Sequence, residues 1–177
     1  MSDESQRWDG ELAERASPAP LLQTWAWGEV QSRAGWTVER VRTDHAMASV
    51  LVRKVGPARE AYVPRGPVPA TDEAIASVIE WARSHRIARI LVEPEATDEL
   101  GETLTARGFA KATPIQPRHT RIVPLVASDD LLKTFKHGRR YNIRTGIKRG
   151  VVVEVGKDAA ELARQSAAVE RRESIRL

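Results

Sequence analysis

Cysteine is absent from the 177-residue sequence, and this absence excludes a disulfide framework, a thiolate nucleophile and a cysteine-ligated zinc site. The four histidines, His45, His85, His119 and His137, lie too far apart along the chain to form a local zinc motif. We therefore predict no metal site.

Long apolar runs are also lacking. They reach only a few residues, far short of the roughly 20 that cross a bilayer, and residues 1–20 are too charged for a signal peptide. We predict a cytoplasmic protein without a transmembrane segment, for which a peripheral contact with the inner membrane face stays open.

The remaining composition is typical of a globular protein, with 41% hydrophobic and 29% charged residues. The net charge is +4, the isoelectric point is about 9.8, and the positive residues are unevenly distributed. Such a distribution indicates an anionic partner.

Apolar periodicity and turn residues predict alternating helices and strands. Residues 1–20 are polar and end in prolines, which predicts a flexible or loosely docked arm. The segment 61–69 contains a short strand that its prolines should soon convert into an edge or a loop. Before and after this segment we predict a helix over 22–35, a hairpin over 36–55, a helix over 71–85, a buried strand over 87–92 and a helix over 97–108. The rest of the chain should contain a strand over 118–125 and a helical stretch over 128–149 that is interrupted at Gly138. It ends with the β-prone residues 151–155 and a helix over 158–175.

This order predicts an α/β fold in which helices flank a mixed, partly antiparallel sheet. We predict a flexible arm at 1–20, one domain at 21–150, and the start of a second unit at 151–177.

The most unusual segment is basic, since no acidic residue occurs between Asp130 and Glu154. Arg139, Arg140 and Arg144 lie within it, beside Tyr141. Such a stretch can neutralise phosphates, and the tyrosine could stack on a base or a sugar. A solvated basic helix face is the alternative interpretation.

Two further segments are candidates for ligand binding. In YVPRGPV, Arg65 lies on a rigid proline-flanked turn, where a guanidinium loses little entropy when it binds an anion. In PIQPRHTRIVPL, the polar residues Gln116, Arg118 and Arg121 lie just before or within a predicted strand. His119 in the same segment has no carboxylate nearby in the sequence that would orient it as a base. Local spacing identifies no general base, catalytic triad or phosphate-binding glycine loop.

The order of elements up to Phe109 resembles the acetyltransferase fold called GNAT, which suggests acetyl-CoA as a donor. That donor needs an Arg/Gln-x-x-Gly-x-Gly/Ala loop that opens a helix. The nearest match is Arg53 to Ala58, and the proline-rich residues after it are unsuited to a helix. We therefore predict no acetyl-CoA binding there.

Four segments in order resemble the Fem family of peptidoglycan-bridge aminoacyltransferases, which has the GNAT-like fold without that loop. They are QTWAWGEVQSRAGW (Gln23 to Trp36), YVPRGPV (Tyr62 to Val68), IQPRHTRIVPL (Ile115 to Leu125) and LLKTFKHGRRYNIRTGIKRGVVV (Leu131 to Val153). The resemblance implies transfer of an amino acid from aminoacyl-tRNA to the peptide stem of UDP-MurNAc-pentapeptide or lipid II. It implies no cofactor and no DNA partner.

The resemblance also has two departures. First, family members usually carry a lysine that contacts the precursor diphosphate at the position where this chain has Gln31. Second, family members contain two GNAT-like units, so this chain is expected to be an incomplete part of such an enzyme. On this basis we assign Gln31, Arg65 and Arg118 to the precursor, and Arg139, Arg140 and Arg144 to phosphate contacts or to packing between units.

Two alternatives remain. The chain could be a non-catalytic basic module that binds RNA or an anionic cell-wall precursor through residues 133–149. It could also be a small-molecule N-acyltransferase with an atypical donor.

Overall fold

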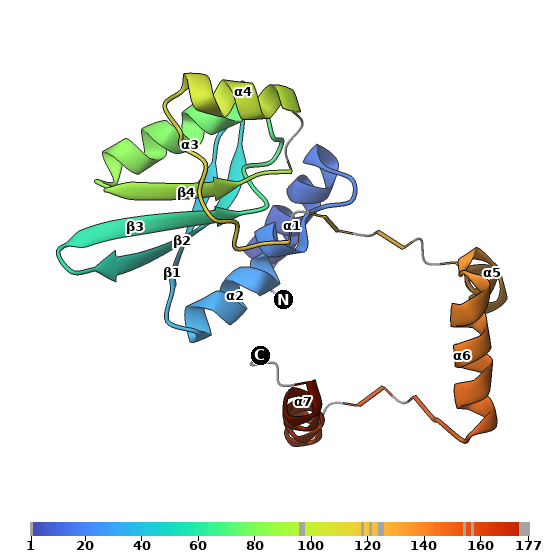
Figure 1. The fold of residues 1–177 in the computed structure, drawn as a ribbon. Coiled ribbons are helices and arrows are strands. Elements are labelled where there is room, and N and C mark those ends of the chain that lie inside the picture. The colour runs from blue at the N-terminus through green and yellow to red at the C-terminus, as the bar shows by residue number, and fades with distance from the viewer. Residues whose placement is uncertain are drawn as a thin grey trace. The chain divides into compact units, whose positions relative to one another are not determined.

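A computed structural model describes residues 2–95, 98–117, 119–120, 122–123, 126–153, 155–156 and 158–173 (Figure 1). The chain divides into two compact units, Met1–Thr120 and Arg121–Leu177. The sequence placed its boundary at 150 instead, and the GNAT-like nature of a second unit remains a prediction.

The first unit is built on a mixed four-stranded sheet in the order β1-β2-β3-β4. β1 and β2 are the predicted hairpin, β3 pairs antiparallel with β2, and β4 joins β3 in parallel. Their bounds are Thr37–Arg42, Met47–Val55, Ala58–Pro64 and Arg89–Glu93. The predicted α/β fold with a mixed sheet flanked by helices is thus confirmed.

The segment 61–69 was predicted to be a short strand that soon becomes an edge or a loop, and the structure shows the loop, which begins after Pro64. β3 is an inner strand between β2 and β4. Pro64 is its last residue, and Pro67 and Pro69 lie beyond its end, so no proline falls in the middle of the ladder.

One face of the sheet packs against α3 (Asp72–Ser84), the predicted helix that Thr71 caps. Alternate residues of the strands point to this side, as period-2 geometry requires. The core there contains Val50, Val63 and Val78, each no more than 1% exposed.

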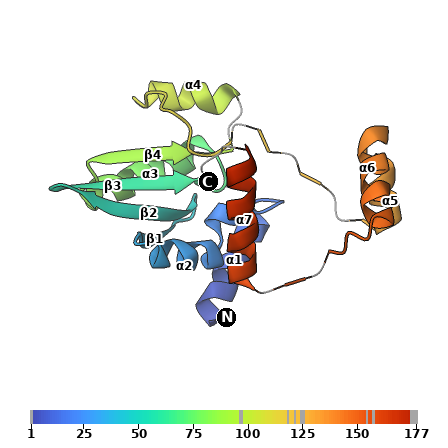
Figure 2. The same cartoon turned by 60° about the horizontal axis from the view of Figure 1, so that its bottom comes forward.

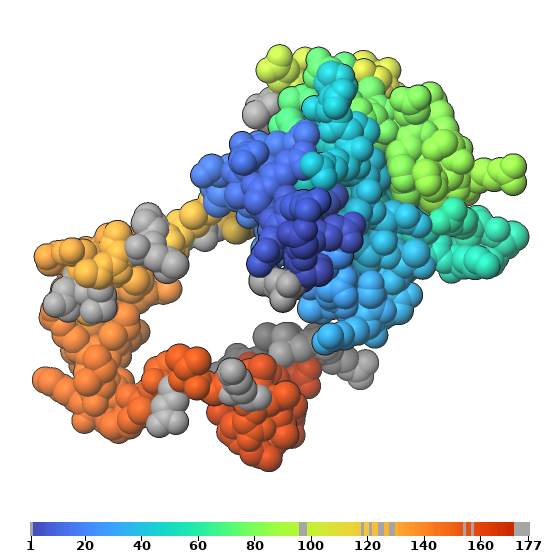
Figure 3. Space-filling view, turned by 180° about the vertical axis from the view of Figure 1, so that it is seen from behind, coloured from blue at the N-terminus to red at the C-terminus, as the bar shows by residue number. Residues whose placement is uncertain are grey.

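The opposite face carries α1 (Asp3–Arg15) and α2 (Trp25–Arg33), joined by the short 3₁₀ helix η1 (Leu21–Gln23). Residues 1–20 were predicted to be a flexible or loosely docked arm, and the structure shows a helix, α1, that buries Trp8 and Leu12 against Met47. Ser2 caps this helix, and its few apolar residues share one face, which is enough to dock a short helix. In Figure 3 the dark blue atoms of α1 lie against the lighter blue and cyan residues that follow.

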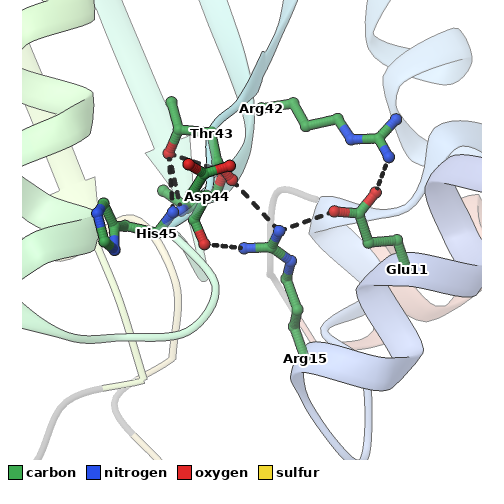
Figure 4. A network of polar contacts seen from close by, with 7 residues as sticks. Glu11, Arg15, Arg42, Thr43, Asp44 and His45 are labelled. Atoms are coloured by element: carbon green, nitrogen blue, oxygen red, sulfur yellow. Dashed lines mark hydrogen bonds and ion pairs between the residues drawn. The ribbon is translucent and has the colours of Figure 1, made fainter.

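An ion-pair network ties α1 to the turn between β1 and β2 (Figure 4). Glu11 accepts a hydrogen bond from Arg15 at 2.8 Å and forms an ion pair with Arg42 at 2.5 Å. Arg15 also donates to the carbonyl oxygens of Thr43 at 3.2 Å and Asp44 at 3.3 Å. The first helix is therefore fixed by polar contacts as well as by its apolar face.

Arg40 on β1 holds α2 against the sheet. Its guanidinium donates to the Trp25 carbonyl at 3.1 Å and to Ser49 Oγ at 2.9 Å, and it stacks over the Trp25 ring at 4.1 Å. Burial lowers the pKa of this guanidinium. A Cβ atom at Gly28 would lie 2.5 Å from the Arg40 guanidinium, so a larger residue there would displace this group.

After β4, the chain forms α4 (Asp98–Ala106), which lies on the β4 side of the sheet in both Figure 1 and Figure 2. Arg107 just after α4 forms an ion pair with Asp72 of α3. The strand predicted over 118–125 does not appear at residues 119–120 and 122–123, and the other four residues of this range lie outside the described part of the chain.

The second unit contains α5 (Ser128–Thr134), α6 (His137–Lys148) and α7 (Ala159–Glu173). The predicted interruption at Gly138 occurs instead at Phe135 and Lys136, whose extended backbone separates α5 from α6. Among the β-prone residues, 151–153 and 155 are not in a strand. Within the described residues, no helix is long and apolar enough to cross a membrane.

Candidate active-site cleft

A cleft of about 1240 Å³ opens on the first unit. Its walls come from α2, from strands β2 to β4, and from the segment that follows α4. This volume is large for a small-molecule site and suits an extended ligand.

Two polar side chains lie near the carboxyl ends of the parallel strands β3 and β4. Tyr62 pairs with Leu91, and Glu93 pairs with Pro64 at the last position of β4. The carboxyl ends of parallel strands are the usual place for ligands in open α/β sheets.

Tyr62, Glu93 and Gln116 form one hydrogen-bonded cluster in the cleft wall. The Tyr62 hydroxyl donates to Glu93, and Gln116 Nε2 donates to the Tyr62 hydroxyl at 3.2 Å. The backbone N–H of Ile115 donates to Glu93 Oε1 at 2.7 Å. Glu93 therefore holds the segment 115–116 across the ends of the strands.

The pKa of Tyr62 is raised, chiefly by burial and then by its hydrogen bond to Glu93. The phenol therefore stays protonated as a hydrogen-bond donor, while the carboxylate supplies acceptors. This pairing can bind an amine or receive a proton from it.

A second, more strongly charged part of the cleft lies at the start of β4. Arg53, Glu60 and Arg89 come from three adjacent strands, and Trp36 stacks on Arg53 with 5.1 Å between the guanidinium carbon and the ring centroid. Arg89 donates to Glu60 at 2.8 Å, which is the main cause of the lowered pKa of Glu60.

The structure places Gln31 in the cleft, one helical turn after Trp27 on α2. Among the described residues, the indole Nε1 of Trp27 is buried without a hydrogen-bond partner. Both side chains belong to the first segment of the family resemblance.

Arg65 has protein partners. It donates to the Pro117 carbonyl at 2.6 Å and to Thr120 Oγ1 at 3.2 Å, and its φ of 50° lies in the left-handed region. The next residue, Gly66, lies so close to Gln23 that a Cβ atom would be 2.7 Å from the amide nitrogen. Arg65 thus brings the YVPRGPV turn to the segment 117–120.

Arg118 lies outside the described residues. Its neighbour Pro117 is held by Arg65.

The three arginines of the basic stretch lie on α6 in the second unit. Arg139 and Arg144 are exposed, whereas Arg140 is half-buried. Arg140 donates to the carbonyl oxygens of Lys133 at 3.2 Å and Phe135 at 2.8 Å, so it closes the end of α5.

Sequence reasoning did not assign Tyr62 or Glu93. One signal was available for each. Tyr62 opens the YVPRGPV segment, and Glu93 directly follows the apolar strand residues Ile90 to Val92. A polar residue immediately after a buried parallel strand is a candidate for a site at the strand end.

The segment Arg53 to Ala58 comprises the end of β2, the two-residue turn at Gly56 and Pro57, and the first residue of β3. It therefore does not open a helix of the kind that holds a pyrophosphate. Within the described residues, no group of three or more His, Asp or Glu side chains could hold a metal ion.

Comparison with known proteins gives sequence relatives. No family model matches the chain. The lipid II:glycine glycyltransferase of Staphylococcus aureus is 29% identical, over 76% of this chain and 38% of that protein's length. The chain thus spans well under half of this relative.

Solved structures resemble the chain only loosely. An acetyltransferase from Trypanosoma brucei matches with a TM-score of 0.41 and 14% identity, covering 68% of this chain and 96% of that protein. The protein TTHA1254 from Thermus thermophilus matches with a TM-score of 0.32 and 21% identity, covering 46% and 65%. These values are too low to carry an argument. The similarity to the glycyltransferase supports the predicted resemblance to the Fem-type transferases.

Proposed function

We propose that this chain is part of an enzyme that transfers an amino acid from aminoacyl-tRNA to an amine on the peptide stem of a peptidoglycan precursor. The main support for this proposal is the hydrogen-bonded cluster of Tyr62, Glu93 and Gln116, which lies in a large cleft of a chain related to a lipid II:glycine glycyltransferase. Since the chain spans 38% of that relative, the activity belongs to the whole enzyme.

The reaction needs little chemistry from the protein because the ester of aminoacyl-tRNA is already activated. The acceptor amine attacks the ester carbonyl, a C–N bond forms and the C–O bond to the tRNA breaks. The proton that the amine loses ends on the released tRNA oxygen, which becomes a hydroxyl. Positioning the amine and stabilising the oxyanion supply most of the rate enhancement.

Glu93 is suited to the amine, and Tyr62 holds this carboxylate in place through its hydrogen bond. A carboxylate at the cleft wall binds an ammonium group and can take up the proton that the amine loses. The phenol, whose pKa is raised by burial, remains a donor at neutral pH. Gln116 orients the phenol through its 3.2 Å hydrogen bond.

The residues predicted to bind the precursor have different roles in this proposal. Gln31 is a wall residue that can donate to the ligand. Arg65 is a positioning residue, because its contacts hold the segment that contains Arg118. The exposed Arg139 and Arg144 are candidates for the tRNA phosphates.

Binding of the acceptor tests the proposal on the chain as it exists. The stem pentapeptide with a free lysine amine should perturb the NMR signals of Glu93 and Ile115, whereas the peptide acetylated at that amine should not. Glu93→Gln should weaken binding by about tenfold, since one charge-assisted hydrogen bond is lost.

Aminoacyl transfer from charged tRNA to UDP-MurNAc-pentapeptide or lipid II is the direct assay, and activity of this chain would support the proposal strongly. Equal binding of the free and acetylated peptides, or binding unaffected by Glu93→Gln, would contradict it.

A further inference from the structure

β4 is the last strand of the sheet, and its outer edge runs along the cleft. All five residues of β4, Arg89 to Glu93, line this cleft. Successive side chains of a strand point to opposite faces of the sheet, so one cleft can touch every residue only where it follows the strand edge. Figure 2 shows β4 at the margin of the sheet nearer to α4. The cleft therefore gives a ligand access to the backbone of β4.

The hairpin between β2 and β3 fixes which backbone groups of β3 point towards β4. A two-residue turn is closed by a hydrogen-bonded pair, which here is Val55 and Ala58. Bonded and non-bonded pairs alternate along an antiparallel ladder. Every second residue of β3 counted from Ala58 therefore bonds to β2, and the residues between them, including Ala61 and Val63, bond to β4.

The parallel register then identifies the free backbone groups of β4. Ala61 pairs with Ile90, and Val63 pairs with Val92. In a parallel ladder, a bonded residue contacts the neighbours on either side of its partner, so Leu91 and the two end residues of β4 face β3. The N–H and C=O groups of Ile90 and Val92 point to the outer edge. Within the described part of the chain, no backbone group bonds to them there.

The two walls beside this edge differ in polarity. On the side of α3 and α4, the apolar side chains of Ile79, Leu104 and Phe109 line the cleft. The polar side chains of Tyr62 and Glu93 lie on the other side. A free strand edge is a template for another strand, whose side chains would alternate between the two walls. An extended peptide that presents apolar groups to one side and a polar group to the other fits this edge.

We propose that the outer edge of β4 binds the acceptor peptide as an added strand, through hydrogen bonds between the peptide backbone and the N–H and C=O groups of Ile90 and Val92. The inference rests on the proposed function, because it states how the acceptor is recognised. Glu93 directly follows Val92, so a peptide side chain that points to the Tyr62 side can bring its amine to this carboxylate. Backbone bonds supply affinity in this mode, and the walls select the side chains.

Methylation of single amide nitrogens of the stem pentapeptide tests the backbone contacts. The amides of the lysine and of the two residues after it are methylated one at a time. Alternate amides of an added strand face β4, so the middle position should behave unlike the two outer ones. Methylation that removes a bond to β4 should weaken binding by about tenfold, and methylation of an amide that faces away should change it by about twofold or less. Calorimetry on the full chain measures each affinity, and equal effects at all three positions would overturn the added strand.

Hydrogen exchange followed by NMR locates the contact on the protein. The amides of Ile90 and Val92 should exchange faster than that of Leu91 in the free chain, because only Leu91 bonds to β3. Peptide at about ten times its dissociation constant should slow both outer amides by about tenfold. Val38 is the matched control, since its partner Leu51 bonds to β3 and its own N–H therefore points away from β2 on the opposite edge strand. Its exchange should stay unchanged.

A second copy of the chain is the competing occupant of this edge. Exchange of Ile90 and Val92 that slows as the protein concentration rises, with no peptide present, would assign the edge to self-association and overturn the proposal. Exchange that a saturating peptide leaves unchanged would overturn it as well.

This test is separable from the amine test at Glu93. Slower exchange of Ile90 and Val92 with the free and the acetylated peptide alike would preserve the added strand and refute the proposed role of the amine. Amine-dependent shifts of the Glu93 signals without slower exchange would preserve the proposed transfer and refute the added strand.

Discussion

At the scale of single residues, Tyr62 joins the sheet to the candidate chemistry. Its hydroxyl contacts both Glu93 and Gln116, which come from segments far apart in the sequence. A phenol in this setting should respond to pH differently from one in the unfolded chain.

Raising the pH should destabilise the native state through Tyr62. In the unfolded chain the phenol ionises near pH 10. The native pKa is higher because of burial and Glu93, so above about pH 10 only the unfolded state releases this proton. The stabilising contribution is complete below that pH and declines above it. Urea midpoints at about pH 9 and about pH 11 measure the decline.

Tyr62→Phe is the control, because it removes the ionising group and keeps the ring. The urea midpoint of this variant should fall less between about pH 9 and about pH 11 than that of the unchanged chain. An identical decline in the variant would mean that other groups cause it.

Gln23 is a second residue whose side chain joins separate segments, because it bonds to buried backbone groups of β2 and β3. It is 0% exposed, accepts from the Ser49 backbone N–H at 2.7 Å and donates to the Pro64 carbonyl. Gln23→Leu should lower the free energy of unfolding by about 3 kcal/mol, because two buried backbone groups lose their partners. Gln31→Leu, at a partly exposed site, should change it by about 0.5 kcal/mol or less. Urea denaturation compares them, and similar losses would refute this role.

At the scale of elements, α1 decides whether residues 1–20 are an arm or part of the fold. Leu12 is fully buried, so Leu12→Ala should cost about 3 kcal/mol. Gly10→Ala should stabilise by up to about 1 kcal/mol, because its Cβ would meet nothing within 4 Å and alanine favours helix. Thermal unfolding gives both values. A flexible arm would leave stability unchanged in both variants.

The arginines of α6 should separate into two classes. If about three to five cations of residues 133–149 meet phosphates, the logarithm of tRNA affinity should fall against the logarithm of salt with a slope of about −2 to −4. Replacing the exposed Arg139 and Arg144 by Gln should make this slope shallower by about 1.5 to 2. Filter binding at several salt concentrations measures it.

Arg140→Gln is the matched comparison, because this guanidinium contacts carbonyl oxygens at the end of α5. It should reduce helical circular dichroism more than it changes the salt slope. An unchanged slope in the double variant would remove α6 from the tRNA interface.

At the scale of the whole molecule, the two units differ in how they bury apolar residues. Both core clusters lie in the first unit. Many exposed large hydrophobic residues lie in the second, including Tyr141 on α6, Val153 and Leu162 on α7. A surface of this kind is typical of a segment that another surface covers.

Residues 1–120 should therefore fold without the rest of the chain. We expect this piece to keep the urea midpoint of the full chain, because every member of the two core clusters is retained. Circular dichroism during urea unfolding makes the comparison. A midpoint that falls clearly below that of the full chain would show that the second unit stabilises the first.

Much of the architecture could be predicted because its signals are local. Thr71 before an acidic first turn marks the start of α3, and Gly35 with a φ of 92° follows α2. Four ordered segments carried the family resemblance, and the glycyltransferase relative supports it. That Gly56 opens no helix was also predictable, since the prolines after it are visible in the sequence.

Only the tertiary structure decided how these segments are used. Residues 1–20 contain few apolar residues, yet Trp8 and Leu12 lie on one helix face that packs against Met47. The expected arm is therefore a docked helix. Arg65 was predicted to bind a ligand, but its guanidinium contacts Pro117, a partner that no local pattern specifies. The clusters around Glu93 and Glu60 likewise join residues from separate strands and segments. Local sequence determines where helices and turns begin, whereas contacts between distant residues depend on strand register and packing.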